Sequence, residues 1–323
     1  MRTTSRDGGG VAALALASAF GLGACQDPLL DPAVVVAPRI VGARVRAEQD
    51  RGSAEPRAGE RASIDWLVLA EREGSFKARV VWCRAAPSSL GSPRCEGTPT
   101  EESSASGSYG SELSWSFQVP DALVPGDAWL SWLGVCEAGE PVFDAPASVF
   151  DCPNGEALAA FYRGFVPAQA ANRNPSLADD VLLLDGAPWN AAELEAAPPR
   201  APRQPCRGSA LPSLSAGAQA LVSFELAGED REPLQPAPCQ YAAHPRESLV
   251  YTHVASHPGL DRAFSAIDYD AAAPAFELLF DGSEAQPGPD GETLLFQLLV
   301  RDERGGADWL RRAACLLPPS VPD

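Results

Sequence analysis

The sequence is poor in the basic side chains that bind nucleic acids. Lysine occurs once in the 323 residues, as Lys77, and the 25 Lys and Arg residues are outnumbered by 43 Asp and Glu. The formal net charge is −18. Because phosphate recognition needs clustered Lys and Arg, this balance argues against a nucleic-acid-binding protein. It also disfavours adsorption to anionic lipid, and an acidic surface of this kind mainly serves solubility.

The common motifs of catalysis and metal binding are also missing. The chain has no G-x-S-x-G nucleophile elbow, no Gly-rich nucleotide-binding signature and no C-x-x-C pair. Long spacings between the eight cysteines argue against a zinc site. Paired carboxylates for glycoside cleavage cannot be picked out among 43 acidic residues. We therefore expect no catalytic residue, no enzyme activity and no cofactor.

Histidine is scarce, and all three histidines lie in one segment, residues 244–261. A helix would bring His253 and His257 to one side at i, i+4, as a metal site requires, and His244 would be the third ligand. The β-branched and aromatic residues between them favour a strand with turn ends instead. We rank a hydrolase or metal-dependent enzyme using these histidines below solvated loop histidines with one on a strand face.

Beyond the N-terminus, no hydrophobic run approaches the length of a membrane-spanning helix. At the N-terminus, two arginines precede an apolar stretch over residues 11–22, which has the layout of a secretory signal. The stretch ends in LGAC at 22–25, the pattern of a lipobox, in which the cysteine is lipidated. We predict a lipoprotein signal peptide over 1–24 and lipidation of Cys25. The competing interpretation is an incidental thiol in a signal that is cut nearby or not at all.

The residues after Cys25 bear on where the lipid would be held. Gln26 follows it, whereas Asp at this position favours inner-membrane retention in the best-studied sorting rule, and Asp27 comes one place later. An outer-membrane anchor is therefore expected over an inner-membrane one, with the periplasmic or surface face left open. Residues 25–37 contain two prolines and are expected to form a short extended tether.

Export accounts for the remaining seven cysteines, since an oxidising compartment favours disulfides. Cys83 and Cys95 are twelve positions apart around a turn-rich loop, and Cys136 and Cys152 bracket a candidate hairpin. Each pair would close a short loop and stabilise the fold by about 3 kcal/mol. Three cysteines remain, Cys206, Cys239 and Cys315. They cannot all pair with one another, so one of the three is free or pairs between chains.

Alternating apolar and polar residues, with 31 prolines and 28 glycines, predict short strands joined by turns. The expected strands are 41–45, 64–68, 76–82, 113–119 and 128–136, then 181–186, 218–226, 248–256, 275–280 and 293–302. Residues 97–110 are expected to be an exposed loop, and 156–166 one or two helical turns. The core of the first half is expected around four tryptophans: Trp66, Trp82, Trp115 and Trp132.

The fold class that these patterns predict is all-β, with two tandem Ig-like β-sandwich domains after the signal peptide. The run 293–302, a Gly-Gly turn and a returning strand predict a closing hairpin, and the strand ending at Cys136 has a similar layout. This weak repeat supports domains at 38–166 and 167–323. A Pro-rich segment, 187–206, is expected to cross the surface of the second.

Four segments together resemble the uncharacterised lipoproteins of high-GC Gram-negative bacteria that carry tandem Ig-like domains. They are LGAC at 22–25, RIVGARVRAE at 39–48, NPSLADDVLLLDG at 174–186 and LLVRDERGGADW at 298–309. The last is also similar to the closing hairpin of PKD-like and bacterial Ig-like domains. The resemblance implies a sandwich fold and a cell-envelope setting. It implies neither a catalytic residue nor a particular ligand.

Two further patterns are candidates for ligand binding. The acidic, Gly-rich segment 281–292 offers oxygens to calcium, although its spacing is not that of a D-x-D-x-D-G loop and a solvated loop is the simpler interpretation. Trp189 and Trp309 are the candidate platform for stacking on a glycan. We predict a non-catalytic protein, held to the membrane by its N-terminal lipid, that presents its domains for interaction with an envelope protein or glycan or for envelope scaffolding. The rival is a carbohydrate-binding surface lipoprotein, with an enzyme ranked third.

Overall fold

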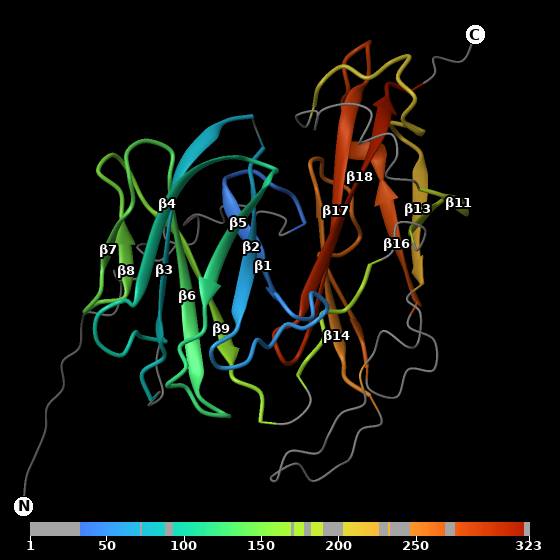
Figure 1. The fold of residues 1–323 in the computed structure, drawn as a ribbon. Coiled ribbons are helices and arrows are strands. Elements are labelled where there is room, and N and C mark those ends of the chain that lie inside the picture. The colour runs from blue at the N-terminus through green and yellow to red at the C-terminus, as the bar shows by residue number, and fades with distance from the viewer. Residues whose placement is uncertain are drawn as a thin grey trace, which may run out of the picture. The chain divides into compact units, whose positions relative to one another are not determined.

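The computed structural model describes residues 33–71, 73–87, 93–168, 171–177, 182–189, 203–225, 232, 246–268 and 275–319. In these ranges the chain is built from strands, with one short 3-10 turn, η2 (Gly282–Glu284) (Figure 1). No helix in the described part of the chain is long and apolar enough to cross a membrane. The all-β prediction is confirmed.

The first half of the chain folds into two antiparallel sheets with a shared core, plus a small hairpin (Figure 1). One sheet has the order β1 (Arg39–Ala47), β2 (Arg61–Leu69), β5 (Glu112–Gln118). The other has the order β4 (Glu101–Ser108), β3 (Ser75–Arg84), β6 (Ala128–Cys136), β9 (Leu158–Phe165). The hairpin pairs β7 (Val142–Asp144) with β8 (Val149–Asp151).

The second half repeats this arrangement with additional strands. Its first sheet has the order β11 (Ala187–Pro188), β10 (Leu182–Leu184), β13 (Gln219–Glu225), β16 (Ala275–Asp281). Its second has the order β12 (Ser213–Ser215), β18 (Ala307–Leu317), β17 (Glu292–Asp302), β14 (Leu249–Ala255), β15 (Phe264–Ile267). In order across the first sheet, β10, β13 and β16 correspond to β1, β2 and β5. In order across the second, β15, β14, β17 and β18 correspond to β4, β3, β6 and β9. Both halves therefore share one topology.

The alternating residues lie where a half-buried strand requires them. Trp66 and Trp82 are almost completely buried in the core of the first half, and Trp115 packs against it, as predicted. The prediction for Trp132 is wrong, since the opposite face of β6 carries it toward Phe143 and Phe150 of the small hairpin. Trp129, fully buried, takes its place in the core. A continuously apolar strand has no polar face to reveal which side is covered.

Two predictions of local structure are corrected. Residues 156–166 contain the strand β9 where helical turns were expected, because pairing with β6 overrides the helix propensity of an Ala-rich segment. Gly164 fits this position because a Cβ atom there would lie 2.2 Å from the indole of Trp129. Residues 97–110 contain the edge strand β4, whose serines and glutamates are mostly exposed and give no apolar alternation.

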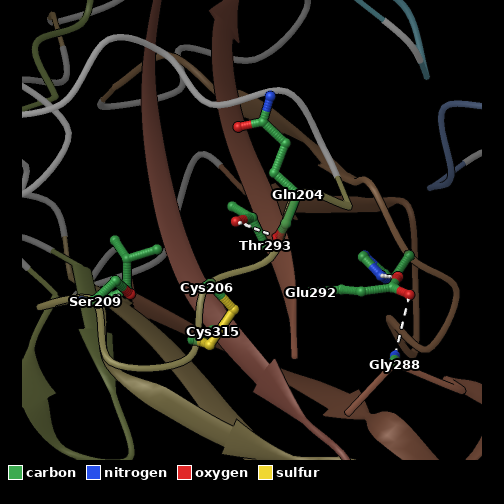
Figure 2. The surroundings of a disulfide bond; sticks show 9 residues. Gln204, Cys206, Ser209, Gly288, Glu292, Thr293 and Cys315 are labelled. Carbon is green, nitrogen blue, oxygen red and sulfur yellow. Dashed lines mark hydrogen bonds and ion pairs between the residues drawn. A yellow bond between two sulfur atoms is a disulfide. The ribbon is translucent and has the colours of Figure 1, made fainter. Parts of the chain in front are cut away.

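Both predicted disulfides and one of the open pairings are present. The Cα atoms are 5.5 Å apart in Cys83–Cys95, 5.7 Å in Cys136–Cys152 and 5.5 Å in Cys206–Cys315. Figure 2 shows the last of these beside Thr293, whose hydroxyl donates to the backbone oxygen of Gln204 at 3.0 Å. The two other cysteines, Cys25 and Cys239, lie outside the described residues.

Candidate functional site

The two described histidines of segment 244–261, which we considered as weak metal ligands, have separate hydrogen-bond partners. His253 is fully buried on β14, where its Nε2 lies 3.0 Å from the hydroxyl of Ser265. The ring of His257 lies between the hydroxyl of Ser256, at 3.0 Å, and the carboxylate of Glu292, at 3.1 Å. His244 lies outside the described residues. Within the described ranges, no group of three or more His, Cys, Asp or Glu side chains is arranged to hold a metal ion.

The structure bears on the candidate glycan platform through the burial of its two tryptophans. Trp189 is 3% exposed, stacks on Phe296 with ring centroids 5.5 Å apart, and donates to the backbone oxygen of Ala313 at 2.9 Å. Trp309 is half-buried, with the guanidinium of Arg44 4.2 Å from its ring centroid. A sugar needs an exposed aromatic face, so Trp189 cannot contribute to the platform, and the two tryptophans do not form it together.

The acidic segment 281–292 is organised by hydrogen bonds within the protein. The carboxylate of Asp281 accepts from the backbone N–H of Ser283 at 2.9 Å. Glu292 accepts from the N–H of Gly288 at 3.3 Å (Figure 2). It also contacts the ring of His257. The backbone oxygen of Asp290 accepts from the N–H of Cys206 at 3.2 Å. These contacts account for the segment as a structural loop.

A charged cluster that the sequence analysis missed lies where the two halves of the chain meet. Arg44, on β1 and 8% exposed, lies 3.5 Å from Asp65 and 3.2 Å from Glu112, and also pairs with Asp308 of β18. Its guanidinium lies over Trp309, whose indole N–H donates to Glu112 at 2.7 Å. We call these five residues the junction cluster. A single buried cation therefore ties strands of the first half to a strand of the second.

The segment 172–177 reinforces the junction by bonding to both halves. The side chain of Asn174 donates to the backbone oxygen of Val45 at 2.7 Å and accepts from the N–H of Ala307 at 3.0 Å. The N–H of Leu177 donates to Asp308 at 2.8 Å. These bonds hold the connecting segment between β1 and the start of β18.

The end of the predicted tether also packs into this region. The oxygen of Ala33 accepts from the N–H of Ala255 on β14 at 2.8 Å, and Val35, 5% exposed, packs with Leu67, Leu69 and Val254. Residues Pro32–Asp323 consequently form one compact unit. Apolar contacts and paired charges both contribute to it.

A second group of charges surrounds the tip of the β17–β18 hairpin. Arg304 lies 3.0 Å from Glu55 and 3.2 Å from Glu232, and Asp302 accepts from the side-chain amide of Asn172 at 2.8 Å. Burial raises the pKa of Asp302 to about 6, with the lowering effect of its hydrogen bonds and of Arg304 only partly offsetting it. Burial likewise raises the pKa of Glu247 to about 7.

These pKa shifts predict a protein that is more stable at mildly acidic than at alkaline pH. Both folded pKa values lie above the unfolded ones, so the stabilising contribution is complete below pH 4 and is lost as the pH rises through about 6 and about 7. Burial lowers the pKa of His253 to about 3, which acts oppositely, because stability is lost as the pH falls from 6.5 toward 3. Because the carboxyl groups lower the stability as the pH rises and His253 lowers it as the pH falls, we expect the maximum stability at acidic pH.

We expect the free energy of unfolding, measured by urea titration, to fall by about 1 kcal/mol between pH 5.5 and pH 8, because His253 and screening by solvent offset part of the carboxyl effect. The double variant Asp302→Asn, Glu247→Gln should flatten this change, whereas Glu101→Gln on the exposed strand β4 should leave it as it is. A wild-type protein whose stability rises over this range would contradict the assignment.

Comparisons with known proteins leave the chain without an assigned family. No family model matches it, and no curated protein matches its sequence. Three solved structures have a weak likeness to this chain. Red sea bream transglutaminase has 12% identity and TM-score 0.24, and the match covers 86% of this chain and 31% of the transglutaminase chain. Spo0M, a sporulation control protein from Bacillus subtilis, has 12% identity and TM-score 0.23, over 87% and 91%. Latent PorU from Porphyromonas gingivalis has 11% identity and TM-score 0.19, over 88% and 24%. At these TM-scores the likenesses support no argument about function.

Proposed function

We propose that the chain is a lipid-anchored, non-catalytic protein of the cell envelope that presents two linked Ig-like β-sandwich domains to a binding partner. The observation that most favours this proposal is the set of three disulfides in one all-β chain. Disulfides persist in oxidising compartments and are rare in the cytosol. They therefore agree with an export signal that ends in the lipobox LGAC.

The strand order supports an Ig-like assignment for both halves. In the first half β1, β2 and β5 form one sheet, as β10, β13 and β16 do in the second half. In the first half the chain changes sheet between β2 and β3 and between β5 and β6. The corresponding changes in the second half are from β13 to β14 and from β16 to β17. Crossing between two facing sheets at these points is the Greek-key pattern of Ig-like sandwiches. Such sandwiches are rigid scaffolds whose loops and edges bind partners.

The junction supports presentation of the two domains as a unit. Interfaces between domains of one chain are commonly loose, and relative motion is expected unless the interface is extensive. Here Arg44 is buried among three carboxylates and an indole, and segment 172–177 bonds to both halves. Binding surfaces on either half would then keep a fixed relation to one another while the lipid holds the N-terminus.

Metabolic labelling tests the anchor directly. In cells given radiolabelled palmitate, the native chain should incorporate label and fractionate with membranes, because the lipobox cysteine receives the acyl chains. The variant Cys25→Ala should lose the label and appear in the soluble fraction, while Cys239→Ala should behave as the native chain does. Equal incorporation by the native chain and Cys25→Ala would overturn the proposal.

A further inference from the structure

The strands β1, β2 and β5 form one sheet (Figure 1). A groove lies on the outer, polar face of this sheet. Strand register places Arg46 of β1 opposite Ser63 of β2, and Ser63 opposite Ser116 of β5. Arg61 lies two residues before Ser63 and therefore shares its face of the strand. With Arg51 at one side, these residues line a space of about 360 Å³. Its size is at the lower end of the range for small-molecule sites.

The charge of this groove is opposite to that of the whole chain. Three arginines line it, Arg46, Arg51 and Arg61, against one acidic residue, Glu48. The chain as a whole carries a net charge of −18, so a local excess of positive charge is not a consequence of composition. Three serine hydroxyls complete the polar lining: Ser63, Ser114 and Ser116.

Two of the three arginines are not used to hold the fold. Arg46 pairs with the buried Asp65 at 2.7 Å, which fixes it at the edge of the groove. Arg51 and Arg61 are exposed, and neither forms an ion pair with any of the described residues. The neighbouring carboxylates are engaged elsewhere, since Asp50 pairs with Arg173 at 2.7 Å and Glu60 accepts from the N–H of Arg57 at 2.9 Å.

The chemistry of the lining selects the kind of ligand. A guanidinium presents a planar fork of donors that binds phosphate or carboxylate oxygens in pairs. Serine hydroxyls both donate and accept, which suits a ligand rich in hydroxyl groups. Of the lining residues only Ala47 and Ala62 are apolar, so neither an acyl chain nor the face of a neutral sugar finds a partner there. The space also exceeds what a bare phosphate ion would occupy.

We propose that this groove binds a phosphorylated saccharide, with Arg51 and Arg61 on the phosphate and the serine hydroxyls on the sugar. Arg46 is a positioning residue that holds the edge of the site through Asp65. The inference rests on the proposed function and deepens it, because it names the class of ligand that the first half of the chain would bind. Binding at the groove can nevertheless be measured without the lipid.

Calorimetric titration of the purified full-length chain tests the site with glucose 6-phosphate, glucose, inorganic phosphate and hexaglutamate at low salt. We expect glucose 6-phosphate to bind at least tenfold more tightly than inorganic phosphate, glucose to give no signal, and the affinity to fall as salt is raised. Arg51→Gln and Arg61→Gln should each weaken glucose 6-phosphate at least tenfold. Since both side chains are exposed, the variants should melt as the native chain does.

The matched control is Arg163→Gln, an exposed arginine of β9 that lies outside the groove. It should bind glucose 6-phosphate as the native chain does. No heat from glucose 6-phosphate, an equal loss in the control, or tighter binding of hexaglutamate would each overturn the proposal. Fatty-acid labelling at Cys25 is an independent readout, so failure of the groove and failure of the anchor are distinguishable.

Discussion

The double variant Cys206→Ala, Cys315→Ala should lose about 4 to 5 kcal/mol of unfolding free energy. The native disulfide closes a loop with a sequence separation of 109 residues, and the chain-entropy model gives about 4.7 kcal/mol for a loop of this size. Both cysteines are 2% exposed, so the substitution also leaves a small cavity beside β18. The bonds from Cys206 and Arg207 to the oxygen of Asp290 involve backbone atoms and should survive.

Urea unfolding monitored by tryptophan fluorescence measures this loss. The matched control is Cys136→Ala, Cys152→Ala, which opens a loop with a separation of only 16 residues and should cost about 3 kcal/mol. The long-loop variant should therefore be the less stable of the two. If it matches the native chain, or if the short-loop variant loses more, the entropic account of this bond is wrong.

Arg44→Met should destabilise the chain by about 3 to 5 kcal/mol, the second-largest effect that we expect. Methionine fills the volume of the side chain but leaves Asp308 without its cation in a poorly hydrated place, while Asp65 keeps only its ion pair with Arg46. The indole of Trp309 also loses the guanidinium that covers it at 4.2 Å. Because the junction joins both halves, unfolding should also become less cooperative.

The control for this prediction is Arg79→Met, which breaks a pair with Glu102 that is 30% and 37% exposed and should change stability by less than about 1 kcal/mol. Adding Asp308→Asn to Arg44→Met should recover part of the loss, since it removes the carboxylate charge that Arg44 no longer pairs with. Denaturant titration followed by far-ultraviolet circular dichroism and fluorescence reports both the stability and the coincidence of the two transitions. A loss below 1 kcal/mol for Arg44→Met would show that the junction cluster does not couple the halves.

Local patterns in the sequence were sufficient for elements whose signal is local. The β17–β18 hairpin follows from an apolar run, a Gly-Gly turn and a returning strand, and Asp302 closes that turn by accepting from the N–H groups of Arg304 and Gly306, both at 2.8 Å. Strand β9 could not be predicted in this way. Its Ala-rich sequence suits a helix, and only the exposed edge of β6 selects the extended form.

Contacts between the two halves were beyond the reach of local patterns. Arg44 and Asp308 are 264 positions apart, and nothing in either neighbourhood indicates the other. The alternation at residues 41–46 did place the basic side chains on one face of β1, but that pattern alone reads as a solvated face. It is the register with β2 that separates Arg44, in the junction, from Arg46, at the groove.

The connectivity of the longest disulfide has a consequence for biogenesis. If the chain is exported as we propose, its N-terminal end emerges first, so Cys206 and Cys239 reach the oxidant before Cys315 does. Thiols oxidised in order of arrival would join neighbours, whereas the native bond joins the first and last of the three. Thiol–disulfide exchange can correct such a mispairing through a mixed intermediate. Maturation of this chain would then depend on a disulfide isomerase, while the two short loops of the first half close between consecutive cysteines.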